Sequence, residues 1–165
     1  MIVPCSMQNL LSSTALVIIM KITVKGFAQG EPIPRKFTCD GEDVSPEIAI
    51  EGVPADAKSL VLIMDDPDAP VGLFTHWIAY NMPPETKLIA EGAGNGKMLH
   101  HGMNDFGKAG YGGSCPPPGK PHRYYFTIYA LNTERIEGGA RRSGIDADMK
   151  GKILEKASYM GTYER

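Results

Sequence analysis

Two aspartates and two histidines stand out in this sequence as groups that can do chemistry together. Asp66 and Asp68 follow an apolar segment directly, and His76 and His122 each begin a later apolar segment. Imidazole N–H groups donate hydrogen bonds to oxyanions, and a nearby carboxylate raises the pKa of a histidine and favours its cationic form. If these side chains converge, they predict a pocket for a small anion.

The same residue types allow two other kinds of site. Two histidines and two aspartates are an acceptable ligand set for zinc or iron. Ser114 or Cys115, with His122 and an aspartate, resembles the nucleophile, base and orienting group of a hydrolase. The three prolines after Cys115 prevent a helix from starting there, so no helix N-terminus can stabilise a thiolate.

Strands are the elements that must position these residues. Ser59–Met64 is apolar on both faces, which is typical of a central strand, and the prolines of Asp65–Pro70 end it in a rigid turn. A second strand begins at His76, so an antiparallel hairpin would place Asp66 and His76 at one end of a sheet. The sequence does not show which strand order brings His122 close to them.

Alternation along two strands predicts which side chains share a face. The predicted sets are His122, Tyr124, Phe126 and Ile128 in one strand, and His76, Ile78 and Tyr80 in the other. Between these strands, residues 90–121 are rich in Gly and Pro, and a loop of that length is often functional.

One helix is predicted near the end of the chain. Asp146 can cap it, Gly161 can end it, and an apolar stripe lies between them. The residues of that stripe are Met149, Ile153, Leu154, Ala157 and Met160. Many strands with one helix predict a mainly β protein, either a sandwich or an open sheet with helical cover.

Composition excludes several classes of protein. The chain has 165 residues, 42% of them hydrophobic and 22% charged, and its formal net charge is −2. These values suit one soluble domain and give no basic surface for nucleic acid. The three cysteines, Cys5, Cys39 and Cys115, have no zinc-binding spacing. We expect free thiols in a reducing cytoplasm, and a Cys39–Cys115 bridge is left open.

The first residues are expected to precede the domain. The apolar run Leu10–Met20 is about half the length of a membrane-spanning helix, and the first lysine, Lys21, follows the run where a secretory signal has basic residues before it. Residues 1–19 are therefore interpreted as an N-terminal extension or an upstream start, with Met20 as the alternative start, and a weak signal sequence is the remaining alternative. Residues 20–165 are predicted to form a single domain.

Several motifs together resemble one known family. They are Asp66-Pro67-Asp68-Ala69-Pro70, His76 at the head of HWIAYN, Gly113–Pro117 followed by Pro121–Tyr124, and the stretches Cys39–Pro46 and Asn104–Gly107. From Met20 to the C-terminus the chain resembles the phosphatidylethanolamine-binding protein family, also called Raf kinase inhibitor protein-like, in its bacterial and archaeal YbhB/YbcL-like branch. Ile50 departs from the tryptophan of many relatives, and Cys115 from the glycine of animal members.

The resemblance implies a fold, a site and a role. The fold is a β-sandwich of a large and a small sheet with a C-terminal helix, and the site binds phosphate- or carboxylate-type anions such as phospholipid headgroups. Carried over residue by residue, the ligand-binding residues are Asp66, Asp68, His76, Pro116, His122 and Tyr124.

Family members also regulate kinases or inhibit serine proteases. We therefore expect a cytoplasmic, non-enzymatic inhibitor of a kinase or serine protease, with no metal and no cofactor. Relatives in this branch can associate, so a homodimer is compatible with the resemblance. The alternative is a metal-dependent or Cys/Ser-His hydrolase that uses the same aspartates and histidines.

Overall fold

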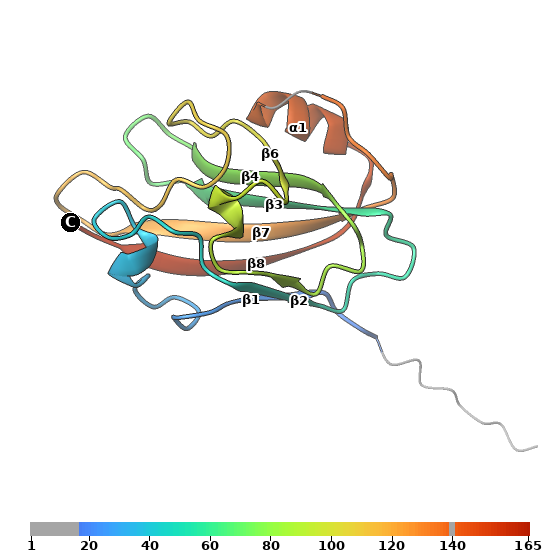
Figure 1. Ribbon diagram of the computed structural model, residues 1–165, viewed down its shortest axis with the longest axis horizontal. Helices are drawn as coiled ribbons and strands as arrows, with labels where there is room; N and C mark the ends of the chain where they lie inside the picture. Colours follow the sequence, from blue (N-terminus) through green and yellow to red (C-terminus); the bar gives the residue numbers. More distant parts are fainter. Residues whose placement is uncertain (1–16, 139–140) are drawn as a thin grey trace, which may run out of the picture.

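Two antiparallel sheets and one α-helix make up the described part of the chain (Figure 1). The structure is a computed structural model that describes residues 17–138 and 141–165. The small sheet has the strand order β1-β2-β5 and the large sheet β6-β4-β3-β7-β8. The strands are β1 (Lys21–Val24), β2 (Ile48–Glu51), β3 (Ser59–Asp66), β4 (Phe74–Met82), β5 (Leu88–Ile89), β6 (His100–His101), β7 (His122–Leu131) and β8 (Ile153–Tyr163). The helical segments are η1 (Arg35–Phe37), η2 (Ala93–Asn95) and α1 (Arg142–Met149).

Two apolar clusters hold these elements in three layers. The first lies between the two sheets, and the second lies between the large sheet and α1, so α1 and the small sheet cover opposite faces of the large sheet (Figure 1). Leu62 belongs to the first cluster and Ile63 to the second, because successive side chains of a strand point to opposite faces. This explains why β3 is apolar on both faces, and the predicted mainly β, two-sheet fold is confirmed.

The hairpin and the central strand were both predicted correctly. β3 pairs with β4 on one side and with β7 on the other, in both cases antiparallel. Because β7 runs against β3, its first residue lies near the last residue of β3. The strand order therefore supplies the step that the sequence left undecided, and places His122 near Asp66.

The predicted C-terminal helix has the wrong extent. The helix α1 begins at Arg142 and contains Asp146, and after a turn at Gly151, whose φ is 76°, the chain enters β8. Gly161 lies within this strand, which pairs with β7 along almost its whole length. Ala157 and Tyr159 pack against the first cluster, so the alternation of a strand, rather than the spacing of a helix, describes this segment.

The structure bears only partly on the predicted N-terminal extension. Residues 1–16 lie outside the described part of the chain, and of the predicted extension 1–19 only Val17–Ile19 are described, with exposed side chains. Across the residues that the structure describes, none of the helices combines the length and the apolar character needed to cross a membrane.

Candidate functional site

A hydrogen-bonded pair of Asp66 and His122 lies at one end of the large sheet. Asp66 ends β3 and His122 begins β7. The Nδ1–H of His122 donates to Oδ2 of Asp66 at 2.7 Å, and each side chain is only 4% exposed. Since Nδ1 is used in this pair, Nε2 is the nitrogen of His122 that can meet a ligand.

A β-bulge turns His76 toward the same side of the sheet. Met64 pairs with Trp77 but Asp65 pairs with Thr75, so His76 is an extra residue in β4. Trp77 belongs to the cluster between the sheets, whereas Thr75 Oγ1 accepts a hydrogen bond from Arg142 on the helix side. The prediction that His76 shares a face with Ile78 and Tyr80 was wrong, because the bulge interrupts the alternation.

His76 is held by main-chain carbonyl groups rather than by a carboxylate. Its Nδ1 lies 2.8 Å from the oxygen of Gly112 and 3.1 Å from that of Gly113, so Nδ1–H donates to both. Burial lowers the pKa of His76, and the two carbonyl groups oppose this only in part. The expected rise in pKa is therefore corrected for this histidine: the ring is a neutral imidazole at neutral pH, and its Nε2 is an acceptor.

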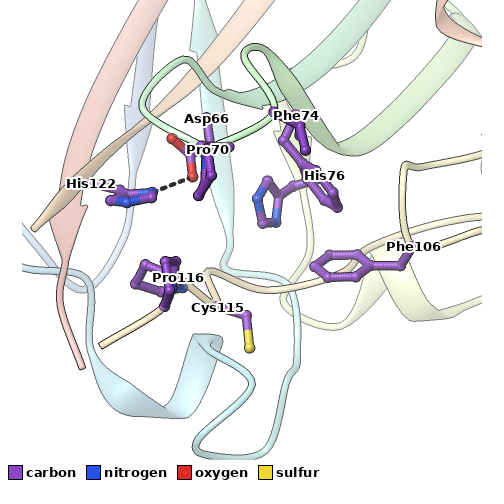
Figure 2. Close-up of a pocket in the computed structure, with 11 residues that line it drawn as sticks. Asp66, Pro70, Phe74, His76, Phe106, Cys115, Pro116 and His122 are labelled. Carbon is purple, nitrogen blue, oxygen red and sulfur yellow. Dashed lines mark hydrogen bonds and ion pairs between the residues drawn. The ribbon is translucent and has the colours of Figure 1, made fainter. Parts of the chain in front are cut away.

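Both histidines line a cavity of about 230 Å³, together with Asp66 and Pro116 (Figure 2). Figure 2 shows Pro116 and Cys115 across the cavity from Asp66 and Pro70. Most of the remaining wall is apolar, and consists of Ala69, Pro70, Val71, Phe74, Phe106 and Pro117. A small concave site with a few polar atoms in an apolar wall is the usual form of a ligand pocket.

Tyr124 packs against the rings of the two histidines but does not line the cavity. Its ring centroid lies 5.2 Å from that of His76 and 6.5 Å from that of His122, and its side chain is completely buried. Burial raises the pKa of its hydroxyl, which has no hydrogen-bond partner among the described residues. The structure therefore places the expected binding residue Tyr124 beneath the site.

Asp68 is turned away from the cavity that it was expected to line. Its two carboxylate oxygens accept hydrogen bonds from Nη2 and Nε of Arg123 at 2.8 and 2.9 Å, and the backbone N–H of Arg123 donates to it as well. These bonds hold the pKa of Asp68 well below its usual range. Its backbone N–H donates to Asp66 at 2.8 Å, so Asp68 fixes the turn after β3 onto β7.

Phe106 is a wall residue to which sequence reasoning assigned no role. It lies in the segment Asn104–Gly107, and its ring packs edge-on against Phe74 and His76 at 4.8 and 5.2 Å between centroids. The segment is fixed to β4 by a hydrogen bond from Thr75 N–H to Asp105 Oδ2. The only available signal was the motif itself, because this contact joins distant parts of the chain.

A disulfide joins Cys39 and Cys115, so free thiols are not what the structure shows at these positions. The two Cα atoms are 5.4 Å apart, although the residues are 76 positions apart in the sequence. Cys5 lies outside the described residues. Disulfides persist in oxidising compartments and in intracellular proteins of hyperthermophiles. The cysteines therefore no longer indicate a reducing cytoplasm.

The predicted alternative of a metal site finds little support in the side-chain arrangement. In residues 17–138 and 141–165, no three His, Cys, Asp or Glu side chains are grouped so that they can hold a metal ion. Asp68, which that alternative needs, is instead bound to Arg123.

Comparisons with known proteins agree with the fold and the motifs. Residues 23–164 match the family described as "PBP: Phosphatidylethanolamine-binding protein". A UPF0098 protein of Aquifex aeolicus is 46% identical over 153 residues, which are 89% of this chain and 90% of that protein.

Two solved structures are similar along most of the chain. CT736 of Chlamydia trachomatis, described as a proposed phosphatidylethanolamine-binding protein homolog, has a TM-score of 0.83 and 42% identity, and the match covers 90% of this chain and 99% of that one. YbcL of E. coli, described as a new member of the mammalian PEBP family, has a TM-score of 0.82 and 30% identity, with 88% and 98% covered.

Proposed function

Because the chain belongs to the phosphatidylethanolamine-binding protein family, we propose that it binds a small phosphate- or carboxylate-type anion in the cavity beside Asp66. The observation that carries this proposal is the use of Nδ1 in both imidazoles. Nδ1–H of His122 donates to a carboxylate and Nδ1–H of His76 donates to two carbonyl groups, so Nε2 of each ring is available to a ligand. Two such atoms in a small, mostly apolar cavity suit an oxyanion with an organic substituent.

The two rings offer unequal partners to that anion. His76 is neutral and its Nε2 accepts a hydrogen bond. When the ring of His122 is protonated, its Nε2–H donates, and Asp66 balances the charge. A phosphate monoester with one proton complements both, because it has an O–H to donate and charged oxygens to accept. A dianion lacks the donor and meets the Asp66 carboxylate, so the protonated form is the better ligand.

The arrangement of the nucleophile candidates favours binding over hydrolysis. Cys115 is part of a disulfide and has no thiol to ionise. The Oγ atom of Ser114 is buried and has no hydrogen-bond partner among the described residues, so no histidine activates it. A Ser–His or Cys–His enzyme needs a nucleophile within hydrogen-bond reach of its base. We therefore propose a binding protein whose ligand is a phosphorylated headgroup or metabolite.

The regulatory part of the proposal concerns the rim of the cavity. The segment Pro117–Lys120 is exposed next to the anion site. Its prolines restrict the backbone, which lowers the entropy lost when a partner binds it. We expect the protein to inhibit a serine protease or a kinase in a panel assay. A Pro117→Gly, Pro118→Gly variant should lose this inhibition. Undiminished inhibition by that variant would place the inhibitory surface elsewhere.

The anion site is tested by NMR titration with ethyl phosphate at pH 6. Wild type should show saturable shifts at the cavity residues, and His122→Ala should bind at least about tenfold more weakly, because a charged hydrogen bond is lost. His100→Ala is the matched control, since His100 is an exposed histidine of β6 outside the cavity. Equal affinity in His122→Ala and His100→Ala would contradict the proposed site.

A further inference from the structure

We infer that the Cys39–Cys115 disulfide is a redox-labile clamp on the wall of the cavity, and that its reduction by a dithiol weakens anion binding. This inference rests on the proposed anion site. Cys115 precedes Pro116 and Pro117 in the cavity wall, while its sulfur points away from the two histidine rings (Figure 2). Its partner Cys39 is exposed. A reductant therefore reaches the bond from outside the cavity.

On the N-terminal side of Cys115, hydrogen bonds hold the loop independently of the disulfide. The N–H of Gly113 donates to Asp43 Oδ1 at 2.7 Å, and the N–H of Cys39 donates to the carbonyl of Ser114 at 3.2 Å. The two loops approach so closely at Gly113 that a Cβ there would lie 2.5 Å from the carbonyl oxygen of Phe37. These contacts keep the carbonyl groups that orient His76 in place when the disulfide opens.

On the C-terminal side of Cys115, the loop is held by few backbone hydrogen bonds, although Pro116 is buried. Pro116, Pro117 and Pro118 have no backbone N–H to donate. Among the described residues, the segment Pro116–Lys120 makes one backbone hydrogen bond, from Gly119 N–H to the carbonyl of Arg165 at 3.2 Å. The disulfide therefore takes the place of the hydrogen bonds that a proline run cannot make.

The acceptor of that single hydrogen bond depends on the same loop as the clamp. Arg165 Nε lies 3.2 Å from Asp40 Oδ1, and Asp40 is the neighbour of Cys39. Opening the disulfide thus loosens the part of the wall formed by Pro116 and Pro117, while the histidines stay positioned. The wall then occupies its binding position for only part of the time, and the apparent affinity falls by that fraction.

The chemical step is thiol–disulfide exchange. A thiolate of the dithiol attacks Sγ of Cys39, the S–S bond breaks, and Cys115 leaves as a thiolate that takes up a proton. The second thiol of the reductant then attacks the mixed disulfide and releases Cys39 as a thiol. The dithiol is oxidised by two electrons to its cyclic disulfide, and the protein disulfide is reduced to two thiols.

The test measures ethyl phosphate affinity at pH 6 by NMR in oxidised protein and in protein reduced with dithiothreitol, a neutral reductant that does not compete for an anion site. Thiol counting verifies the reduction. We expect affinity about tenfold weaker after reduction, as for a wall in place about a tenth of the time. Chemical shifts should change around residues 35–43 and 115–123 and stay unchanged in the central strands.

A Cys39→Ser, Cys115→Ser variant provides the control. It should bind like the reduced protein in both conditions and show no response to dithiothreitol. Equal affinity of oxidised and reduced wild type overturns the clamp, and so does global loss of the folded spectrum on reduction, because the effect would then not be local. Failure of the oxidised protein to bind any anion contradicts the proposed function instead, so the two failures are distinguishable.

Discussion

Asp65 and Asp66 are consecutive residues of β3, yet their carboxylates serve opposite faces of the large sheet. Asp65 pairs with Arg142 of α1, and Asp66 pairs with His122 beside the cavity. Burial raises the pKa of Asp65 in spite of the nearby arginine, which marks its pair as part of the packing between helix and sheet. The two residues therefore offer matched substitutions of the same chemistry with different expected effects.

Asp66→Asn should weaken anion binding about tenfold, because a neutral amide does not stabilise the protonated ring of His122. Asp65→Asn should leave the affinity unchanged and lower the Tm, since it removes a partner of Arg142. Titration with ethyl phosphate and thermal unfolding measure the two effects. Similar affinities in the two variants would show that the Asp66–His122 pair does not belong to the binding site.

The affinity for a phosphate monoester should fall as the pH rises from 6 to 8. Because burial lowers the pKa of His76 below its usual value, its ring is neutral at pH 7 and above and accepts the ligand proton. A phosphate monoester loses that proton near pH 6, so the affinity should drop by up to about tenfold for each pH unit above this value. Calorimetry at several pH values checks this.

Dimethyl phosphate is the control for the pH dependence, since its charge is constant between pH 6 and 8. Any pH dependence that it shows reports the protein groups alone. A monoester affinity that is flat over the range would contradict the preference for the protonated ligand.

Asp68→Asn should lower stability without changing anion affinity by more than about twofold. The pKa of Asp68 is lowered by Arg123, so its carboxylate stabilises the folded state above the unfolded pKa of about 4, and this contribution is lost as the pH falls through the lower folded pKa. The difference in Tm between wild type and variant should therefore be largest at neutral pH and shrink below pH 4. Asp56→Asn, in an exposed loop, is the control and should show no such difference. A strong loss of binding in Asp68→Asn would show that Asp68 contributes to the binding site.

Removing the disulfide should lower the unfolding free energy by about 4 kcal/mol, because the bond closes a long loop in the unfolded chain. For a chain of this size that corresponds to a fall in Tm of about 10 °C. Differential scanning calorimetry of wild type and the double serine variant measures the change. Unchanged Tm values would mean that the bond adds no stability under the conditions used.

Phe106→Ala should reduce the preference for an anion with an aromatic substituent. Its half-exposed ring packs on Phe74 and His76 and forms one side of the cavity. Replacing it should weaken phenyl phosphate binding about fivefold and inorganic phosphate binding hardly at all, since the aromatic contact contributes about 1 kcal/mol. Leu88→Ala, at an exposed apolar residue of the small sheet, is the control. An equal loss for both ligands would assign Phe106 to support of His76 instead.

Local signals predicted the parts of the site that depend on turns and strand ends. The prolines around Asp68 end β3, and His122 opens an alternating aromatic strand, so both positions follow from short stretches of sequence. The hairpin also follows, because a short connection favours antiparallel neighbours. The position of β7 beside β3 is a property of the whole sheet, and the sequence left it undecided.

The errors arise where distant contacts outweigh local spacing. The apolar residues of Ile153–Met160 fit both a helix and a strand, and pairing with β7 decides in favour of the strand. The carboxylate of Asp68 points to Arg123 because β7 passes beside the turn. The bond between Cys39 and Cys115 likewise depends on two loops meeting in space, which spacing along the chain does not reveal.

The bulge in β4 also restricts how this region can change in evolution. The turn residues between Asp66 and Phe74 can be added or lost at the surface without altering which way His76 faces. His76 is the single residue between Thr75 and Trp77, so deleting it would restore regular pairing and remove the imidazole from the cavity. Length variation among homologues should therefore gather in the turn and be absent from those three positions.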